Sequence, residues 1–221
     1  MKITETSLFK NVNIDAKILN DINLKKVNSK KIIVEEGTLS SPCLFIVKSG
    51  LVVISKTDLN GSEVSLASKN SGGYFGEFSI FYDKPVNGKV VSLVDTEYWT
   101  LTGSFLELVL LKDANFTFNL FKDATNYLKI SAENRIIDLH GGAQKKIVYQ
   151  LMKLGKKDTI NNKLIIDANL NQYIISSLAG ITRETVSREI QKLKKSNILL
   201  VNEKKQWMLD INLANLLLEA S

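Results

Sequence analysis

The sequence is poor in the residues that bind metal ions and form disulfides. Its 221 residues include one cysteine, Cys43, and one histidine, His140. These two residues cannot form a disulfide within the chain or a metal centre that needs several Cys and His ligands. A single histidine also leaves little material for a base-activated nucleophile, and no Gly-rich loop followed by Lys and Ser or Thr is present. We therefore expect no metal and no cofactor, and we expect that the protein is not an enzyme.

The sequence also lacks long hydrophobic runs and has few prolines. No window of about 18 uncharged apolar residues occurs, and no apolar segment follows the positive charge at the N-terminus. Membrane insertion and secretion are therefore not predicted, and we expect a cytoplasmic protein with no membrane partner. Two prolines, 44% hydrophobic residues and 24% charged residues are typical of a chain that folds around a core. A length of 221 residues suits two compact domains.

Arginine is absent from the first part of the chain, and positive charge is concentrated in the last part. The first arginine is Arg135. Residues 1–140 carry 16 basic and 16 acidic side chains, whereas residues 141–221 carry 13 basic and 7 acidic ones, so the whole formal net charge of +6 lies in residues 141–221. A basic module joined to a neutral one indicates a polyanionic partner, of which nucleic acid is the most common.

Short β-type runs separated by turn residues fill the chain from about Val27 to Leu101. The segment Asp58-Leu59-Asn60-Gly61 is typical of a hairpin turn, because Asn-Gly tolerates the positive φ of tight hairpins. Short strands with glycine-rich corners predict an antiparallel β-roll or jelly roll, which we place at residues 1–103. The predicted runs are Lys31–Glu35, Leu44–Val47, Leu51–Lys56, Val64–Ala67 and Lys89–Leu101.

Residues 104–140 predict one long helix. No glycine or proline lies between Ser104 and Leu139, and apolar residues recur every three or four positions. This spacing predicts a two-helix seam and hence a homodimer; the alternative is a helix that packs on its own β-roll. The predicted seam consists of Phe116, Leu120, Tyr127, Ile130 and Ile137. Gly141-Gly142 then forms either a plain helix end or a hinge between the two parts of the chain.

Residues 141–221 predict a winged helix-turn-helix, which makes the whole chain α+β. Asn171 and Thr182 are suited to cap the second and third helices, and a short turn that contains Gly180 separates these helices. The predicted helices are Lys145–Leu154, Asn171–Ala179 and Arg183–Lys195. The predicted wing consists of the runs Ile198–Val201 and Gln206–Leu209, with the polar turn Asn202–Lys205 between them.

The third helix has the residue types of a DNA-recognition helix. Val186, Ile190 and Leu193 should face the core, which leaves a polar face for the major groove. Thr182 and Asn171, at helix N-termini, are suited to orient backbone amides toward phosphates. The expected DNA-binding residues are Arg183, Glu184, Arg188, Ser187, Thr182, Asn171, Gln191 and Lys192, with Lys194 and Lys195 as further phosphate contacts. The alternative is a solvated helix with an ion pair between Glu184 and Arg188.

Two groups of motifs carry a resemblance to a known family. The run Leu178–Arg188 is similar to the helix-turn-helix of the Crp/Fnr family of bacterial transcription regulators. Phe45–Gly50, Asn60-Gly61 and Gly73–Glu77 resemble that family's cyclic-nucleotide-binding β-roll. The resemblance implies a homodimer on a palindromic promoter site with half-sites similar to TGTGA or TTGA, read by Arg183, Glu184 and Arg188. It also implies RNA polymerase as a partner, with the segment Lys156–Lys163 where family activators touch it.

The family's nucleotide pocket is only half matched. Gly76 and Glu77 match its Gly-Glu pair, but Asn87-Gly88-Lys89 stands where an Arg-Ser-Ala stretch is expected. Lys89 or Lys84 offers only a point charge to a cyclic phosphate. We therefore expect an effector other than a cyclic nucleotide, or none. The expected ligand-binding residues are Gly76, Glu77, Phe78, Lys89, Leu128 and Ser131, beside Phe75.

Three alternatives stay open at this point. The first is a regulator that does respond to a cyclic nucleotide. The second is a ligand-binding signalling module whose basic tail binds a partner other than DNA. The third concerns Cys43, which is either a buried apolar residue or a redox sensor.

Overall fold

The computed structural model describes residues 1–14, 19, 22–38, 42–57, 61, 63–81, 88–158, 162–166, 170–203 and 206–220. The chain divides into two compact units, Met1–Lys129 and Ile130–Ser221, and the boundary lies inside a long helix. Each unit is described by itself. Within the described part of the chain, no helix combines the length and the apolarity needed to cross a bilayer.

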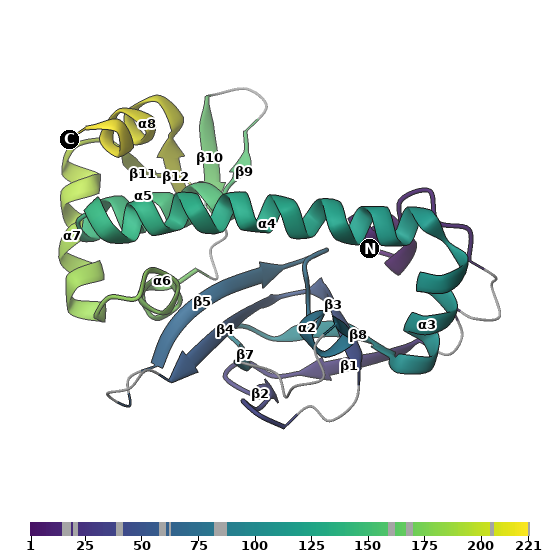
Figure 1. The fold of residues 1–221 in the computed structure, drawn as a ribbon. Coiled ribbons are helices and arrows are strands. Elements are labelled where there is room, and N and C mark those ends of the chain that lie inside the picture. The colour runs from purple at the N-terminus through teal and green to yellow at the C-terminus, as the bar shows by residue number, and fades with distance from the viewer. Residues whose placement is uncertain are drawn as a thin grey trace. The chain divides into compact units, whose positions relative to one another are not determined.

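The first unit is a roll of two four-stranded antiparallel sheets, as the sequence predicts (Figure 1). One sheet has the strand order β1-β8-β3-β6 and the other β2-β7-β4-β5. Strand β4 pairs with β5 in a hairpin whose last pair is Thr57 with Glu63. The predicted turn lies between these strands, where Gly61 has φ +80°, but Asp58, Leu59 and Asn60 lie outside the described residues. The strands are β1 (Asn23–Val27), β2 (Ile32–Val34), β3 (Cys43–Ser49), β4 (Leu51–Thr57), β5 (Glu63–Asn70), β6 (Tyr74–Phe75), β7 (Lys89–Ser92) and β8 (Thr96–Thr102).

Strand β3 is buried on both faces and supports two hydrophobic cores. Phe45 and Val47 point into a core between the two sheets, together with Val52 of β4 and Val90 of β7. Leu44 and Ile46 point the other way, because alternate side chains of a strand face opposite sides. This second core is covered by the short 3-10 helices Ile3–Glu5 and Ser7–Phe9 and by helices α3 (Gly103–Lys112) and α4 (Ala114–His140). A short helix, α2 (Phe78–Phe81), follows β6.

The prediction of one continuous helix over residues 104–140 is wrong at Asp113. Its carboxylate oxygen Oδ1 accepts hydrogen bonds from the backbone amides of Asn115 (2.8 Å) and Phe116 (3.3 Å). An aspartate that satisfies the first free amides of a helix marks a new N-terminus. The chain therefore ends α3 at Lys112 and starts α4 at Ala114.

The predicted dimer seam is also wrong for its first two positions. Phe116 and Leu120 are 0% and 4% exposed, because they fill the core of their own unit, where Phe116 packs edge-on against Phe9. A different stripe of α4 faces outward. Phe118, Phe121 and Leu128 are 65%, 67% and 67% exposed, and we call these three residues the outer stripe. The 3–4 spacing cannot tell which of two apolar stripes faces the core.

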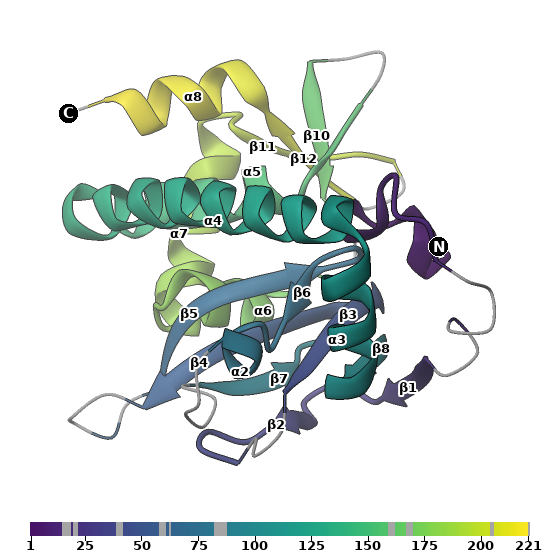
Figure 2. The ribbon, with the colours of Figure 1, turned by 45° about the vertical axis from the view of Figure 1, so that its right-hand side comes forward.

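The second unit contains the predicted winged helix-turn-helix, together with three elements that were not predicted. Its four strands pair in the order β11-β12-β10-β9. Residues Lys156–Lys163, expected as a loop, begin and end in strands β9 and β10, and a C-terminal helix α8 follows β12 (Figure 2). Asp210 caps α8, since its Oδ1 accepts from the Leu213 amide at 3.1 Å. The elements are α5 (Ala143–Leu154), β9 (Lys156–Lys157), β10 (Lys163–Ile166), α6 (Gln172–Ala179), α7 (Arg183–Lys195), β11 (Leu199–Val201), β12 (Trp207–Asp210) and α8 (Ile211–Glu219).

Candidate nucleic-acid interface and ligand cavity

A tight turn sets helix α7 at an angle to α6. Gly180 ends α6 with φ +62°, a left-handed conformation that favours glycine. Asn171 caps α6, because its Oδ1 accepts from the Ile174 amide at 3.1 Å. Thr182 caps α7, because its Oγ1 accepts from the Thr185 amide at 3.3 Å. Both predicted caps are therefore present. Their contacts with phosphates stay predictions.

Helix α7 has one buried face and one polar face. Val186, Ile190 and Leu193 are buried against the rest of the unit. Ser187 is half-buried, with its Oγ 3.5 Å from Nε2 of Gln172 on α6. The predicted DNA-binding residues Arg183, Glu184, Arg188, Gln191 and Lys192 are all exposed. The three predicted base-reading residues, Arg183, Glu184 and Arg188, are thus exposed on α7, and their contacts with DNA stay a prediction.

Three residues that sequence reasoning missed contact the cations of this face. The Arg183 guanidinium lies over the ring of Tyr173 on α6, 4.6 Å from its centroid. The Lys194 ammonium lies 5.6 Å from the ring centroid of Trp207 on β12. The third residue is Glu189, on α7 itself. Tyr173 and Trp207 lie on other elements than their partners, ten and thirteen residues away in the chain, so no local sequence pattern predicts these contacts.

Glu189 pairs with two cations of α7. Its Oε1 accepts hydrogen bonds from Arg188 Nε (3.3 Å) and Lys192 Nζ (2.9 Å). These two donors, Lys192 first, hold the pKa of Glu189 below its ordinary value. Arg188 is therefore paired with Glu189, whereas the alternative interpretation of this helix paired it with Glu184. The pKa of Glu184 is lowered chiefly by its own backbone amide and by the Thr182 hydroxyl.

The first unit encloses a cavity of about 200 Å³. Gly76 forms its corner with φ +94°, and a methyl group there would lie 2.6 Å from the Cys43 carbonyl oxygen. One basic and one acidic side chain, Lys69 and Glu77, face the cavity among largely apolar neighbours. The lining residues are Val34, Ile54, Leu66, Ala67, Lys69, Phe75, Gly76, Glu77, Phe78, Gly88, Val90 and Tyr127.

Burial shifts the pKa of both Glu77 and Lys69. It raises the pKa of Glu77, although the nearby Lys69 opposes this rise. It lowers the pKa of Lys69, which Glu77 and Asp123 oppose. The Lys69 ammonium lies 4.8 Å from the ring centroid of Tyr127 and 5.4 Å from that of Tyr74, so two aromatic faces replace part of its lost hydration. The cavity can therefore hold a small, largely apolar molecule with one or two polar groups.

Only part of the predicted ligand set lies at this cavity. Gly76, Glu77 and Phe78 line it, but Lys89 pairs with Glu63 at 3.6 Å and is not a lining residue. Leu128 and Ser131 are not lining residues either, and Leu128 belongs to the outer stripe. The reason is helical geometry, since one residue turns a helix by about 100°. Lys84, the other candidate for a point charge, and Asn87 lie outside the described residues.

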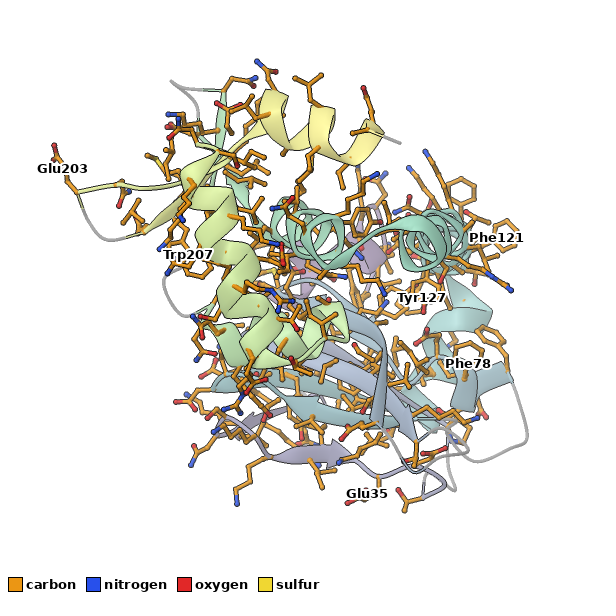
Figure 3. All side chains as sticks on the ribbon, turned by 90° about the vertical axis from the view of Figure 1, so that its left-hand side faces the viewer. Glu35, Phe78, Phe121, Tyr127, Glu203 and Trp207 are labelled. Atoms are coloured by element: carbon orange, nitrogen blue, oxygen red, sulfur yellow. The ribbon has the colours of Figure 1, made fainter. Side chains whose placement is uncertain are left out.

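Tyr127 is the residue of α4 that reaches the cavity. Figure 3 shows it pointing toward the roll and toward Phe78, whereas Phe121 points outward from the same helix. Lys69 of β5 was missed too. The alternation of side chains along β5 could have indicated Lys69 as a cavity residue, because it places Lys69 on the same face as Ala67.

Cys43 has the environment of a structural residue. It is buried in the core between the sheets. Burial raises the pKa of its thiol to about 11, so the thiol is protonated at neutral pH and is a poor nucleophile.

Comparisons with known proteins agree with this architecture. Residues 24–113 match the cyclic nucleotide-binding domain family, and residues 145–217 match the Crp-like helix-turn-helix domain family. The anaerobic regulatory protein of Bacillus subtilis is 24% identical over 193 residues, which cover 84% of this chain and 79% of that protein. The cyclic AMP receptor protein of Thermus thermophilus is 26% identical over 156 residues, or 71% of this chain and 70% of that protein.

Solved structures share the fold. The structure of FixK2 from Bradyrhizobium japonicum has a TM-score of 0.73 at 19% identity and covers 90% of this chain and 98% of its own. A CooA variant from Carboxydothermus hydrogenoformans has a TM-score of 0.73 at 20% identity and covers 97% of this chain and 96% of its own.

Proposed function

Because the chain belongs to the Crp/Fnr family of transcription regulators, we propose that it binds a palindromic promoter site as a homodimer under the control of a small molecule other than a cyclic nucleotide. Regulators of this family bind DNA and function as dimers. The observation that carries the proposal is the exposed set Arg183, Glu184 and Arg188 on a capped α7. Arg can present two donors to guanine O6 and N7, and Glu can accept from a cytosine amino group.

The outer stripe of α4 supports the homodimer. Three large apolar side chains, Phe118, Phe121 and Leu128, are each about two-thirds exposed on one helix, with spacings of three and seven residues. Such a stripe is costly in water and suits the same stripe of a second copy across a two-fold axis. A two-fold dimer would present its two α7 helices to half-sites about one DNA turn, roughly 34 Å, apart. Contact of the segment Lys156–Lys163 with RNA polymerase stays a prediction.

The cavity chemistry supports an effector without a cyclic phosphate. Several relatives are named for cyclic AMP. The first unit of this chain, however, contains no arginine. A buried phosphate monoanion is best held by a guanidinium that donates two parallel hydrogen bonds, and a lysine gives only a point charge. Lys69 also has the carboxylates of Glu77 and Asp123 nearby, which weaken its attraction for an anion.

Site selection tests the DNA-binding part of the proposal. The full chain is incubated with a pool of random duplexes, and the bound sequences are recovered and compared. We expect a consensus with two-fold symmetry. Recovery of duplexes without any shared sequence would favour the alternative, a signalling module whose basic part binds another partner.

Thermal unfolding tests the effector part. A ligand at about 100 times its Kd stabilises the folded state by about 2.7 kcal/mol, which shifts the melting temperature measurably. We expect no shift with cyclic AMP or cyclic GMP. A dose-dependent shift that Glu77→Gln abolishes would show instead that the protein is a cyclic-nucleotide-responsive regulator.

A further inference from the structure

Helix α7 carries an acidic side chain that its neighbours largely cover. Glu189 has a side chain that is 9% exposed, while its partners Arg188 and Lys192 are 66% and 57% exposed. A carboxylate at such a position is unfavourable unless cations pair with it. Both cations donate to the same oxygen, Oε1. The carboxylate therefore lies beneath the polar face, and the two cations extend from it toward solvent.

The hydrogen bond to Arg188 determines which donors of this arginine remain free. A guanidinium has five N–H donors, one on Nε and four on the two Nη atoms. Glu189 takes the Nε donor. The two Nη atoms then form a fork at the exposed end of the side chain, and this fork matches the O6 and N7 acceptors of guanine. A side chain already held in this orientation loses less rotational freedom when it binds.

The same carboxylate also counters a repulsion within the helix. Arg188 and Lys192 are four residues apart, so their like charges are neighbours on the helix surface and repel each other. Glu189 bridges them. Without this bridge, each cation would move apart from the other and sample more rotamers, including ones that point only at phosphates.

We propose that Glu189 is a positioning residue for DNA recognition, which holds the Arg188 fork toward base edges and so increases discrimination between base pairs. The inference rests on the proposed function, because it takes Arg188 as a base-reading residue. It also predicts an unusual pair of effects. Removing the negative charge should strengthen binding to DNA of any sequence, because phosphates dominate that binding, while it weakens the preference for the correct base pair.

The test uses three variants of the full chain. Glu189→Leu removes the acceptor and places an apolar side chain at a covered position, so we expect the fold to be kept. Glu189→Gln keeps an acceptor but removes the charge. Glu219→Gln is the matched control, since it removes one exposed carboxylate from α8 of the same unit. Each protein is titrated against the duplex selected by the wild-type protein and against duplexes with each base pair of a half-site replaced.

For each duplex with one replaced base pair, the affinity for the selected duplex is divided by the affinity for the replaced one. At one half-site position, we expect Glu189→Leu to reduce this ratio about tenfold, a loss within the range for one bidentate contact. Glu189→Gln should reduce it less, and Glu219→Gln should leave it unchanged. Affinity for unrelated DNA should rise in Glu189→Leu and Glu189→Gln. A wild-type protein without any base preference would refute the proposed function. A wild-type protein with a base preference that Glu189→Leu retains in full would refute the positioning role, whatever happens to its melting temperature.

Discussion

The exposure of the outer stripe of α4 predicts how much the dimer should lose in stability when one of its side chains is truncated. Phe121 is 67% exposed. Complete burial of a Phe side chain is worth about 1.5–3 kcal/mol, so burial of its exposed two-thirds in a dimer is worth about 1–2 kcal/mol. A two-fold interface contains the residue twice. Phe121→Ala should therefore weaken the dimer by about 2–4 kcal/mol, or roughly 30-fold to 1,000-fold in its dissociation constant.

Sedimentation velocity over a series of protein concentrations measures this effect. Phe81→Ala is the matched control, because Phe81 is 64% exposed but lies on α2 instead of α4. We expect the control to assemble as the wild-type protein does. An unchanged dissociation constant in Phe121→Ala, or an equal loss in both variants, would refute the reasoning that the outer stripe forms the dimer contact.

Three further predictions concern the N-cap of α7, the titration of Glu77 and the glycine pair that precedes α5. Thr182→Ala removes the N-cap of α7 and should lower the stability of the second unit by about 1 kcal/mol. The midpoint of urea unfolding measures this loss. An unchanged midpoint would show that the cap contributes nothing. Burial raises the pKa of Glu77 above its ordinary value of 4.5, so the folded state binds this proton more tightly and stability falls as the pH rises through the folded pKa. Glu77→Gln should remove that fall in urea titrations carried out at pH values above 4.5, and identical pH profiles of the two proteins would count against it. A methyl group at Gly141 would clash with the Ile137 carbonyl oxygen, whereas Gly142 has φ −64° and an open Cβ position among the described atoms. Gly142→Ala should accordingly stabilise the helix start by about 0.4–1 kcal/mol while Gly141→Ala destabilises, and both should alter effector coupling if the glycines form a hinge.

Local signals account for the parts of the fold that the sequence predicts well. The boundaries of α6 and α7 depend on Asn171, Gly180 and Thr182, which act on amides and carbonyls within a few residues of themselves. The same local chemistry was present at Asp113, where a capping aspartate interrupts an otherwise unbroken apolar pattern. The apolar spacing alone therefore predicts one helix, whereas the capping aspartate indicates two.

Long-range contacts account for what the sequence does not predict. Lys69 and Tyr127 meet across 58 positions of the chain because β5 and α4 border the same cavity. The choice between Tyr127 and Leu128 as the cavity residue depends on the rotation of α4 about its axis, which its contacts with the roll determine. Phe116 and Leu120 were assigned to a dimer seam for the same reason. Nothing in the sequence singles out Glu189, because acidic residues are rarely buried, and its two cationic partners explain the exception.

The proposed function requires that α7 reads base sequence through its arginines. The most direct measurement compares Arg188→Ala with Lys195→Ala on the duplex selected by the wild-type protein and on an unrelated duplex, at several salt concentrations. We predict that Arg188→Ala loses about 1–3 kcal/mol on the selected duplex and loses its preference at one base pair, whereas Lys195→Ala weakens binding to both duplexes alike. Equal losses on both duplexes in Arg188→Ala would contradict the account, because they would show that this arginine contacts only the phosphate backbone.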